Sequence, residues 1–226
     1  MPSPLIIFDL DGTLFHTAPD LMDSLNHVIG TAGLAPVNFD DMTFLVGSGA
    51  RAMIARALEL RETQVEPAAF EQMFMQFLEH YSASMPGASE PYPGVVEAMD
   101  RLAAADYALA VCTNKTEAMA RRLLDLTGHL PRFSAVTGGD TFSVKKPDAG
   151  HILSTIEQAG GDPALSIMIG DSVNDISAAR NAGVASIGVP FGYSDTAMEE
   201  LGPDHILGHY NELTPELVGR LLSLNR

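Results

Sequence analysis

Short, uninterrupted apolar runs are the feature that most constrains the fold of this 226-residue chain. The first run, Leu5-Ile6-Ile7-Phe8, is closed at once by Asp9. Runs of this kind suit strands that are covered on both faces, as in parallel α/β sheets. Four later runs continue the pattern: residues 107–112, 134–137, 165–169 and 185–189.

Helical patterns lie between these runs. Apolar residues recur there with a spacing close to 3.6 residues, which is typical of helices with one buried face. The stretches are residues 95–105, 116–126, 149–159 and 175–182. Because strands and helices alternate, the sequence predicts an α/β fold with a Rossmann-like parallel sheet and helices on both of its faces.

The stretch from about residue 15 to 89 differs, because it contains no convincing strand. Three parts of it have the pattern of amphipathic helices: residues 20–32, 50–60 and 67–81. We therefore expect two domains, a core formed by residues 1–14 and 90–226 and an all-helical insertion at 15–89. Inserted directly after the first strand, it would lie over the carboxyl ends of the strands, where open α/β sheets bind ligands.

The formal net charge of −16 restricts the partners of the chain. An acidic surface repels nucleic-acid phosphates and anionic lipid headgroups, so we expect neither nucleic acid nor membrane as a partner. A small phosphorylated substrate would need positive charge concentrated locally, with help from a metal ion. The sequence has three lysines, Lys115, Lys145 and Lys146, and all three fall in candidate site segments.

The compartment expected for the chain is the cytoplasm. A single cysteine, Cys112, excludes an internal disulfide and a zinc site built on several cysteines. The amino terminus has no basic region followed by a long apolar stretch, so it does not have the pattern of a secretory signal. No segment approaches the roughly 18 consecutive apolar residues of a membrane span.

The segment Asp9-Leu10-Asp11-Gly12-Thr13 carries the first candidate chemistry. Side chains at positions i and i+2 point to the same side of a strand, and Gly12 permits a sharp turn away from the sheet. One carboxylate could attack phosphorus while the other carries a proton for the leaving group. Two like charges this close raise one pKa. The alternative is an ordinary polar loop, since Asp-Gly is a common turn.

Three further segments follow later apolar runs. Thr113 and Asn114 could donate to phosphate at a strand-to-helix junction, although both residue types also cap helices. The Lys146 ammonium could neutralise phosphate oxygens, whereas Lys145 is better explained as part of an exposed loop. Asp171 and Asp175, four residues apart at a helix start, could hold one Mg²⁺ ion. Helix capping by Asp171 or Ser172 is the alternative there.

All four segments would emerge at one edge of a parallel sheet. Their order along the chain is acid pair, hydroxyl, lysine and acid pair, and this combination argues for phosphoryl transfer. Competing motifs are absent from the sequence: there is no Walker A segment, no His-Glu-x-x-His and no Gly-x-Ser-x-Gly. Cys112 lacks the arginine of a cysteine-phosphatase loop, so we expect it in the core. Gly47-x-Gly49 lacks the third glycine of a dinucleotide site.

With these four motifs the chain resembles the haloacid dehalogenase-like hydrolase superfamily over nearly its whole length. Among the subfamilies it looks closest to the phosphoglycolate phosphatases, in which a helical cap is inserted between the first two motifs. Four less specific stretches support the subfamily: Val46-Gly47-Ser48-Gly49-Ala50-Arg51, Thr113-Asn114-Lys115, Gly138-Gly139-Asp140 and Phe191-Gly192-Tyr193.

The resemblance implies catalytic roles for the first motif and a metal site. Asp9 would be the nucleophile that forms an aspartyl-phosphate, and Asp11 would be the acid and base. Mg²⁺ would be held by Asp9, the Asp11 backbone carbonyl and Asp171, with Asp175 orienting the shell.

The resemblance also implies a phosphate-binding set: Gly12, Thr113, Asn114 and Lys146. Arg51, at a helix start in the cap, could meet a substrate carboxylate, although an ordinary surface arginine is the better explanation for it. His16 stands where many relatives carry an acid, and a structural place near the hinge is the better explanation for it.

The resemblance implies a magnesium-dependent phosphatase acting on a small phosphorylated metabolite, with 2-phosphoglycolate as the leading substrate. A sugar phosphomutase similar to β-phosphoglucomutase would share all four motifs and differ only in the cap. A non-enzymatic phospho-switch places its acid pair before the phosphorylated aspartate, and a binding protein would not need every catalytic position filled, so both are disfavoured. Monomer and homodimer both stay open.

Overall fold

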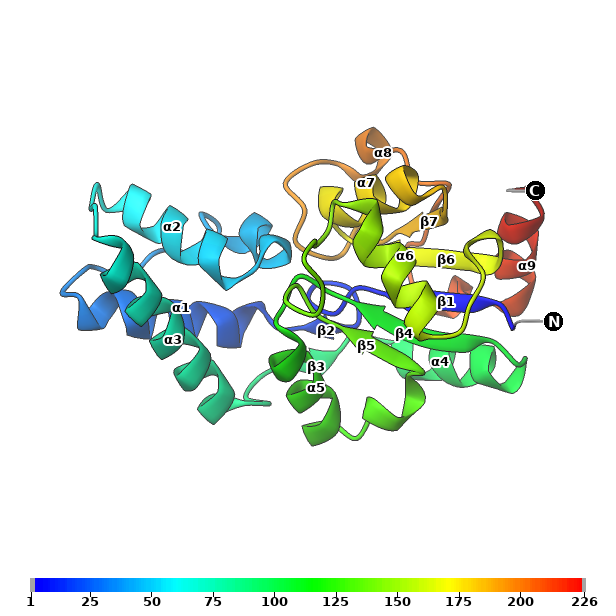
Figure 1. Ribbon diagram of the computed structural model, residues 1–226, viewed down its shortest axis with the longest axis horizontal. Coiled ribbons are helices and arrows are strands. Elements are labelled where there is room, and N and C mark those ends of the chain that lie inside the picture. The colour runs from blue at the N-terminus through cyan, green and yellow to red at the C-terminus, as the bar shows by residue number, and fades with distance from the viewer. Residues whose placement is uncertain (1–2, 225–226) are drawn as a thin grey trace.

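The computed structural model describes residues 3–224 and contains two groups of elements (Figure 1). One group is a parallel sheet with helices on both faces, which confirms the predicted α/β class. The other group contains helices α1 (Ala18–Thr31), α2 (Ala50–Leu60) and α3 (Pro67–Ser84). Figure 1 shows these helices gathered beyond the end of the sheet where β1 leads into the chain's first loop.

The sheet has six strands in the order β5-β4-β1-β6-β7-β8, and every pair is parallel. The strands are β1 (Leu5–Phe8), β4 (Ala108–Cys112), β5 (Ala135–Thr137), β6 (Ser166–Gly170), β7 (Ala185–Gly188) and β8 (His205–Ile206). Phe8 pairs with Val111 on one side and with Ile169 on the other. This register brings the carboxyl ends of β1, β4 and β6 to one edge, as the apolar runs predicted.

Two apolar layers cover the faces of the sheet. Alternate residues of β1 belong to different layers, Ile6 and Phe8 to the larger one and Leu5 and Ile7 to the smaller. This is why the run is apolar at every position. The helices of this part are α4 (Val95–Ala104), α5 (Glu117–Leu126), α6 (Ala149–Gln158), α7 (Val173–Ala182), α8 (Met198–Leu201) and α9 (Pro215–Leu224).

The expectation that residues 15–89 contain no strand is wrong in one detail. Strand β2 (Phe15–His16) pairs antiparallel with β3 (Glu90–Pro91). The two strands lie where the chain leaves the sheet and where it returns, so they join the two connections to the helical group. Two residues are too short for any alternation of apolar and polar side chains to show in the sequence.

The ten-residue helix α9 and several short elements were also not predicted. A 3₁₀ helix (Thr43–Ser48) precedes α2, and the edge strand β8 has two residues. Helix α2 begins and ends where the apolar spacing predicted, and α3 continues three residues beyond the predicted end at Tyr81. In residues 3–224 no helix is long and apolar enough to cross a membrane.

Candidate active site

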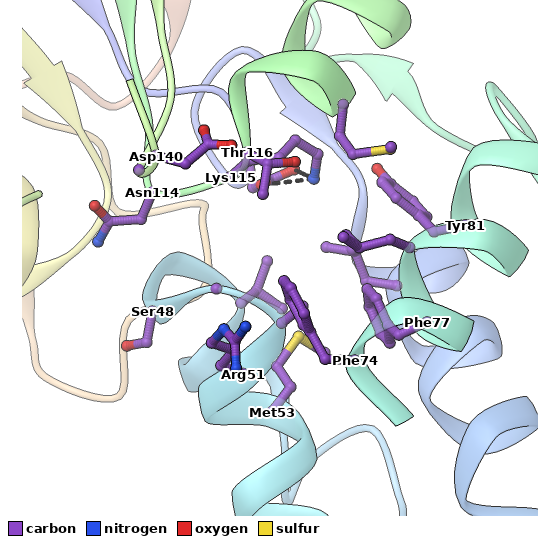
Figure 2. A pocket seen from close by; sticks show the side chains of 18 of the residues that line it. Ser48, Arg51, Met53, Phe74, Phe77, Tyr81, Asn114, Lys115, Thr116 and Asp140 are labelled. Carbon is purple, nitrogen blue, oxygen red and sulfur yellow. Dashed lines mark hydrogen bonds and ion pairs between the residues drawn. The ribbon is translucent and has the colours of Figure 1, made fainter. Parts of the chain in front are cut away.

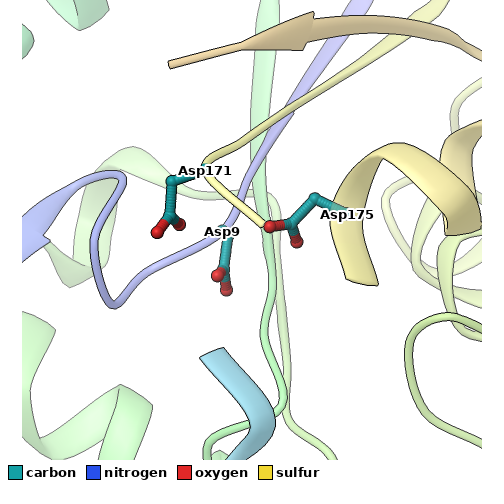
Figure 3. A group of neighbouring side chains, drawn as sticks. All are labelled: Asp9, Asp171 and Asp175. Carbon is teal, nitrogen blue, oxygen red and sulfur yellow. The ribbon is translucent and has the colours of Figure 1, made fainter. Parts of the chain in front are cut away.

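The carboxyl edge of the sheet gathers three buried acids, Asp9, Asp171 and Asp175 (Figure 3). Asp9 directly follows β1 and Asp171 directly follows β6, and these strands are neighbours in the sheet. Asp175 lies in the first turn of α7. One carboxylate oxygen from each of the three lies within 4.8 Å of the others. The fold thus brings together acids that are far apart in the chain.

Burial has the largest effect on the ionisation of these acids. It raises the pKa of Asp9 to about 7, with the Lys146 ammonium opposing the rise and Asp175 and Asp11 adding to it. Burial also raises the pKa of Asp171 well above its ordinary value, helped by Asp175 and Asp9. The sequence argument ascribed a raised pKa to repulsion between Asp9 and Asp11, but burial contributes more.

The acids and their neighbours fit a divalent metal ion. Asp9 Oδ1 is buried and has no hydrogen-bond partner among residues 3–224. Lys146 Nζ lies 3.0 Å from it, but without hydrogen-bond alignment. Asp171 is oriented by Thr13 Oγ1, which donates at 2.9 Å, and by the Tyr193 N–H at 2.7 Å. Clustered buried carboxylates need compensating positive charge, and hard cations prefer such oxygen ligands.

Lys146 and Asp175 form a buried ion pair beside this cluster. Lys146 Nζ donates to Asp175 Oδ1 at 2.5 Å and to the Cys112 carbonyl at 2.6 Å. Asp175 Oδ2 accepts from the Ser172 N–H at 3.0 Å and from Ser172 Oγ at 2.6 Å. Both oxygens of Asp175 therefore have donors, which suits an orienting role. Helix capping, the alternative explanation for this segment, is also present, because Ser172 and Asp175 form a capping box.

Asp11 belongs to a second buried ion pair. Lys115 Nζ donates to Asp11 Oδ1 at 2.8 Å and to Oδ2 at 2.9 Å, and Thr17 Oγ1 donates to Oδ1 at 2.6 Å. Sequence reasoning did not find this contact with Lys115. The signal that could have found it is the scarcity of lysine, since each of the three lysines lies in a motif segment.

Thr113 and Asn114 lie between the sheet and the helical group. Thr113 is buried, and its N–H donates to the Thr137 carbonyl at 3.1 Å. Asn114 Nδ2 donates to the Lys146 carbonyl at 3.1 Å and to the Gly47 carbonyl at 3.2 Å. The alternative that these residues cap the next helix is not observed, because Thr116 occupies the N-cap position of α5.

Gly12 is required by a close approach. Its φ is +83°, and a Cβ atom at this position would lie 2.4 Å from Asp171 Oδ2. Only glycine therefore lets the first loop turn back against the carboxylate that follows β6.

The remaining candidates lie at the edges of the site. Arg51 donates to both carboxylate oxygens of Glu71, at 2.5 and 2.8 Å, and its guanidinium lies 3.9 Å from the centroid of the Phe74 ring. His16 Nδ1 lies 2.9 Å from the Tyr193 hydroxyl in the connection to α1. Lys145 is exposed and Cys112 is buried, both as expected.

A cavity of about 300 Å³ opens next to Asp11 (Figure 2). The sheet part contributes Asp11, Asn114 and Lys115 to its lining. Helices α2 and α3 contribute mainly apolar residues: Met53, Phe74, Phe77, Leu78 and Tyr81. A small molecule in this cavity would touch the acid pair segment and the helical group together.

Comparison with known proteins places the chain in a family. Residues 6–189 match the family model of haloacid dehalogenase-like hydrolases. The chain belongs to this family of hydrolases, whose phosphatases generally use a metal ion.

Several relatives are similar over nearly the full length. The chain is 58% identical to a phosphoglycolate phosphatase of Agrobacterium fabrum, over 98% of this chain and 95% of that protein. It is 44% identical to a phosphoglycolate phosphatase of Mesorhizobium japonicum, over 98% of each. A crystal structure of a predicted phosphoglycolate phosphatase from Haemophilus somnus has a TM-score of 0.88 at 30% identity and covers 93% of this chain and 96% of that one.

The fold extends to proteins of other names. A β-phosphoglucomutase from Clostridium difficile has a TM-score of 0.81 at 18% identity, with 98% of each chain covered. At this identity the likeness concerns the fold alone.

Proposed function

We propose that this chain is a magnesium-dependent phosphatase that hydrolyses 2-phosphoglycolate through an aspartyl-phosphate on Asp9. The buried cluster of Asp9, Asp171 and Asp175 beside the Lys146 ammonium carries the proposal. In such a site a metal ion and the lysine ammonium would stabilise the negative charge that spreads over a phosphoryl group during its transfer. The relatives named phosphoglycolate phosphatase support the substrate.

The residues of the site have distinct tasks in the proposed reaction. Asp9 attacks phosphorus and the ester bond breaks, while Asp11 gives a proton to the departing glycolate oxygen. Asp11 then takes a proton from the water that hydrolyses the aspartyl-phosphate. Lys146, Thr113 and the backbone at Gly12 and Asn114 hold the phosphoryl oxygens.

The metal site has its own set of residues in the proposal. Asp9, Asp171 and the Asp11 backbone carbonyl would hold Mg²⁺, and Asp175 would orient the ligands. When bound, the ion neutralises phosphoryl charge and keeps the nucleophile ionised.

Substrate choice belongs, in this proposal, to the helical insertion. Residues 15–89 would form a cap domain on a core of residues 1–14 and 90–226. The cavity between Asp11 and helices α2 and α3 supports this division, because the chemistry lines one side and the insertion lines the other. Arg51 lines the same cavity and is a candidate to meet a substrate carboxylate.

A phosphate-release screen over small phosphorylated metabolites tests the proposal. With Mg²⁺ present we expect the highest kcat/KM for 2-phosphoglycolate. Asp9→Asn should abolish phosphate release, since an amide cannot serve as the nucleophile. Asp106→Asn is the matched control, because Asp106 is exposed and has a positive φ that asparagine tolerates.

Two results would count against the proposal. Turnover retained in Asp9→Asn would remove the nucleophile assignment. Little net phosphate release from any metabolite, together with transfer of phosphate between positions of a sugar, would identify a mutase.

A further inference from the structure

Lys115 and Tyr81 form an unexplained pair of donors in the wall of the cavity (Figure 2). Lys115 precedes α5 in the sheet part, and Tyr81 lies in α3 of the helical group. Lys115 Nζ lies 4.6 Å from the centroid of the Tyr81 ring. Both side chains are buried, with exposed fractions of 9% and 1%. Neither residue has a task in the proposed reaction.

The Tyr81 hydroxyl is an unsatisfied buried donor. It has no hydrogen-bond partner within residues 3–224, and Tyr81 is one of the residues that line the cavity. Buried hydroxyls normally have a partner, and leaving one without costs about 1–3 kcal/mol. Burial raises the pKa of Tyr81 to about 12, so the hydroxyl keeps its proton near neutral pH. An acceptor that enters the cavity would satisfy it.

Lys115 has donor capacity beyond its contact with Asp11. An ammonium has three N–H groups, and two of the hydrogen bonds of Lys115 go to the Asp11 oxygens. Burial lowers the pKa of Lys115, but Asp11 and Tyr81 together raise this pKa by more than burial lowers it. The group therefore stays cationic. One N–H thus has no hydrogen-bond acceptor within residues 3–224 and is available for an anionic acceptor beside the Tyr81 ring.

We propose that Lys115 and the Tyr81 hydroxyl bind the carboxylate of the substrate and so select phosphomonoesters with a carboxylate close to the ester oxygen. The inference rests on the proposed function, and it names the residues that recognise the non-phosphate end of the substrate. It assigns Lys115 a second task as the residue that positions Asp11.

The length of the substrate favours Lys115 over Arg51. Asp11 must lie against the ester oxygen to protonate it, and in 2-phosphoglycolate one methylene carbon separates this oxygen from the carboxylate. The cation that contacts Asp11 is therefore the one within reach. Figure 2 shows Arg51 across the cavity from Lys115, and both ends of its guanidinium already donate to Glu71.

The arrangement makes recognition depend on both parts of the chain. Lys115 comes from the part that carries the reacting acids, and Tyr81 comes from the helical group. The cavity lining also contains apolar residues, among them Phe77 and Met119, which would help to shield the carboxylate from water. Charged hydrogen bonds are stronger in such surroundings than in water.

Two substrates that differ only in the carboxylate measure its contribution to recognition. Ethyl phosphate has the same two-carbon chain as 2-phosphoglycolate but no carboxylate, so the ratio of the two kcat/KM values measures its recognition. Tyr81→Phe removes one hydroxyl, and we expect this ratio to fall about tenfold, which corresponds to about 1.4 kcal/mol. If kcat/KM fell equally for both substrates, the ratio would be unchanged. Tyr81 would then have a structural role, and the inference would be overturned.

Tyr107→Phe is the matched control, because it removes a hydroxyl that donates to the Pro215 carbonyl, and neither residue lines the cavity. It should keep the wild-type ratio. Arg51→Met tests the competing cation. If the ratio of the two kcat/KM values fell in Arg51→Met and kept its wild-type value in Tyr81→Phe, the carboxylate would be bound by Arg51. This result would overturn the inference.

Binding to an inactive variant separates this inference from the proposed function. Calorimetry gives the Kd of 2-phosphoglycolate for Asp9→Asn with Mg²⁺ present, without any turnover. Adding Tyr81→Phe should weaken this binding about tenfold, and equal binding would overturn the subsite. If the wild-type protein released no phosphate from 2-phosphoglycolate, the proposed function would fail, while this binding comparison would still decide the subsite.

Discussion

Two buried lysines divide the acids of the site between them. Lys146 contacts Asp9 and Asp175, and Lys115 contacts Asp11. Within residues 3–224, no lysine or arginine pairs with Asp171, whose partners are the Thr13 hydroxyl and the Tyr193 N–H. The acid without a cationic side chain is thus the one expected to depend most on a metal ion.

Gly192 should be required for the position of Asp171. A Cβ atom on Gly192 would lie 2.3 Å from both Cβ and Oδ2 of Asp171, so Gly192→Ala must move the carboxylate or its loop. A displacement of about 1 Å in a catalytic group can cost about 100-fold in rate. We expect kcat/KM to fall by about this factor, with partial recovery at high Mg²⁺, as measured in a Mg²⁺ titration of phosphate release.

Gly30→Ala is the control for this substitution. An added Cβ on Gly30 meets no atom within 4 Å, and alanine favours a helix interior. It should keep the wild-type activity and Mg²⁺ requirement. A Gly192→Ala protein with the wild-type Mg²⁺ requirement would show that the loop adapts without moving Asp171.

At the scale of elements, most long apolar patterns were predicted, with α9 the exception, and the short pairings were not. The run Leu5-Ile6-Ile7-Phe8 is β1, and the helix predicted at 50–60 is α2, because burial of one face or both leaves a period in the sequence. Strands β2 and β3 depend on each other across the whole insertion. Two-residue strands leave no such period.

Asp20 links the two connections of the helical group. It lies in the first turn of α1, where Oδ1 accepts from the Ala88 N–H at 2.9 Å and Oδ2 accepts from Ser89 Oγ at 2.5 Å. Asp20→Ala would leave both donors without this acceptor. Hydrogen bonds to charged groups contribute about 1.5–3 kcal/mol, so we expect unfolding in urea to show a loss of about 2–3 kcal/mol.

Asp23→Ala provides the comparison for this loss, since Asp23 lies in the same helix and is exposed. Its effect should stay within about 0.5 kcal/mol. Equal stabilities of the two variants would mean that the contact of Asp20 with the returning chain contributes nothing measurable.

At the scale of the molecule, the sequence predicted which segments meet and not how they are paired. Parallel strands have their carboxyl ends at one edge, so the convergence of Asp9, Lys146 and Asp171 followed from the order of the elements. The contacts of Lys115 with Asp11 and Tyr81 depend on how the helical group packs on the sheet part. No local pattern in the sequence encodes that packing.

The response of stability to pH depends on the charge of the whole molecule and on its buried acids. The chain has a net charge of −16, and burial raises the pKa of Asp9 from 3.8 to about 7 and that of Asp171 in the same direction. A carboxyl with a raised pKa in the folded state binds more protons there than in the unfolded chain. Without metal, its effect on stability becomes less favourable as pH rises through the range from 3.8 to about 7. Relief of the overall negative charge at lower pH acts in the same direction.

Bound Mg²⁺ should reverse the cost of ionising these acids, because metal binding requires carboxylates and releases their protons. We expect the rise in Tm on adding saturating Mg²⁺, about 5 to 10 °C at about 100-fold excess over Kd, to be larger near pH 8 than near pH 5.5. Scanning calorimetry with EDTA or Mg²⁺ at each pH measures this rise in Tm.

The variant Asp171→Asn distinguishes the contribution of the metal site from that of the overall charge. It should abolish the Mg²⁺ response and keep the general gain in stability at low pH. A Mg²⁺ response of equal size at both pH values would contradict the raised pKa values as the origin of the effect.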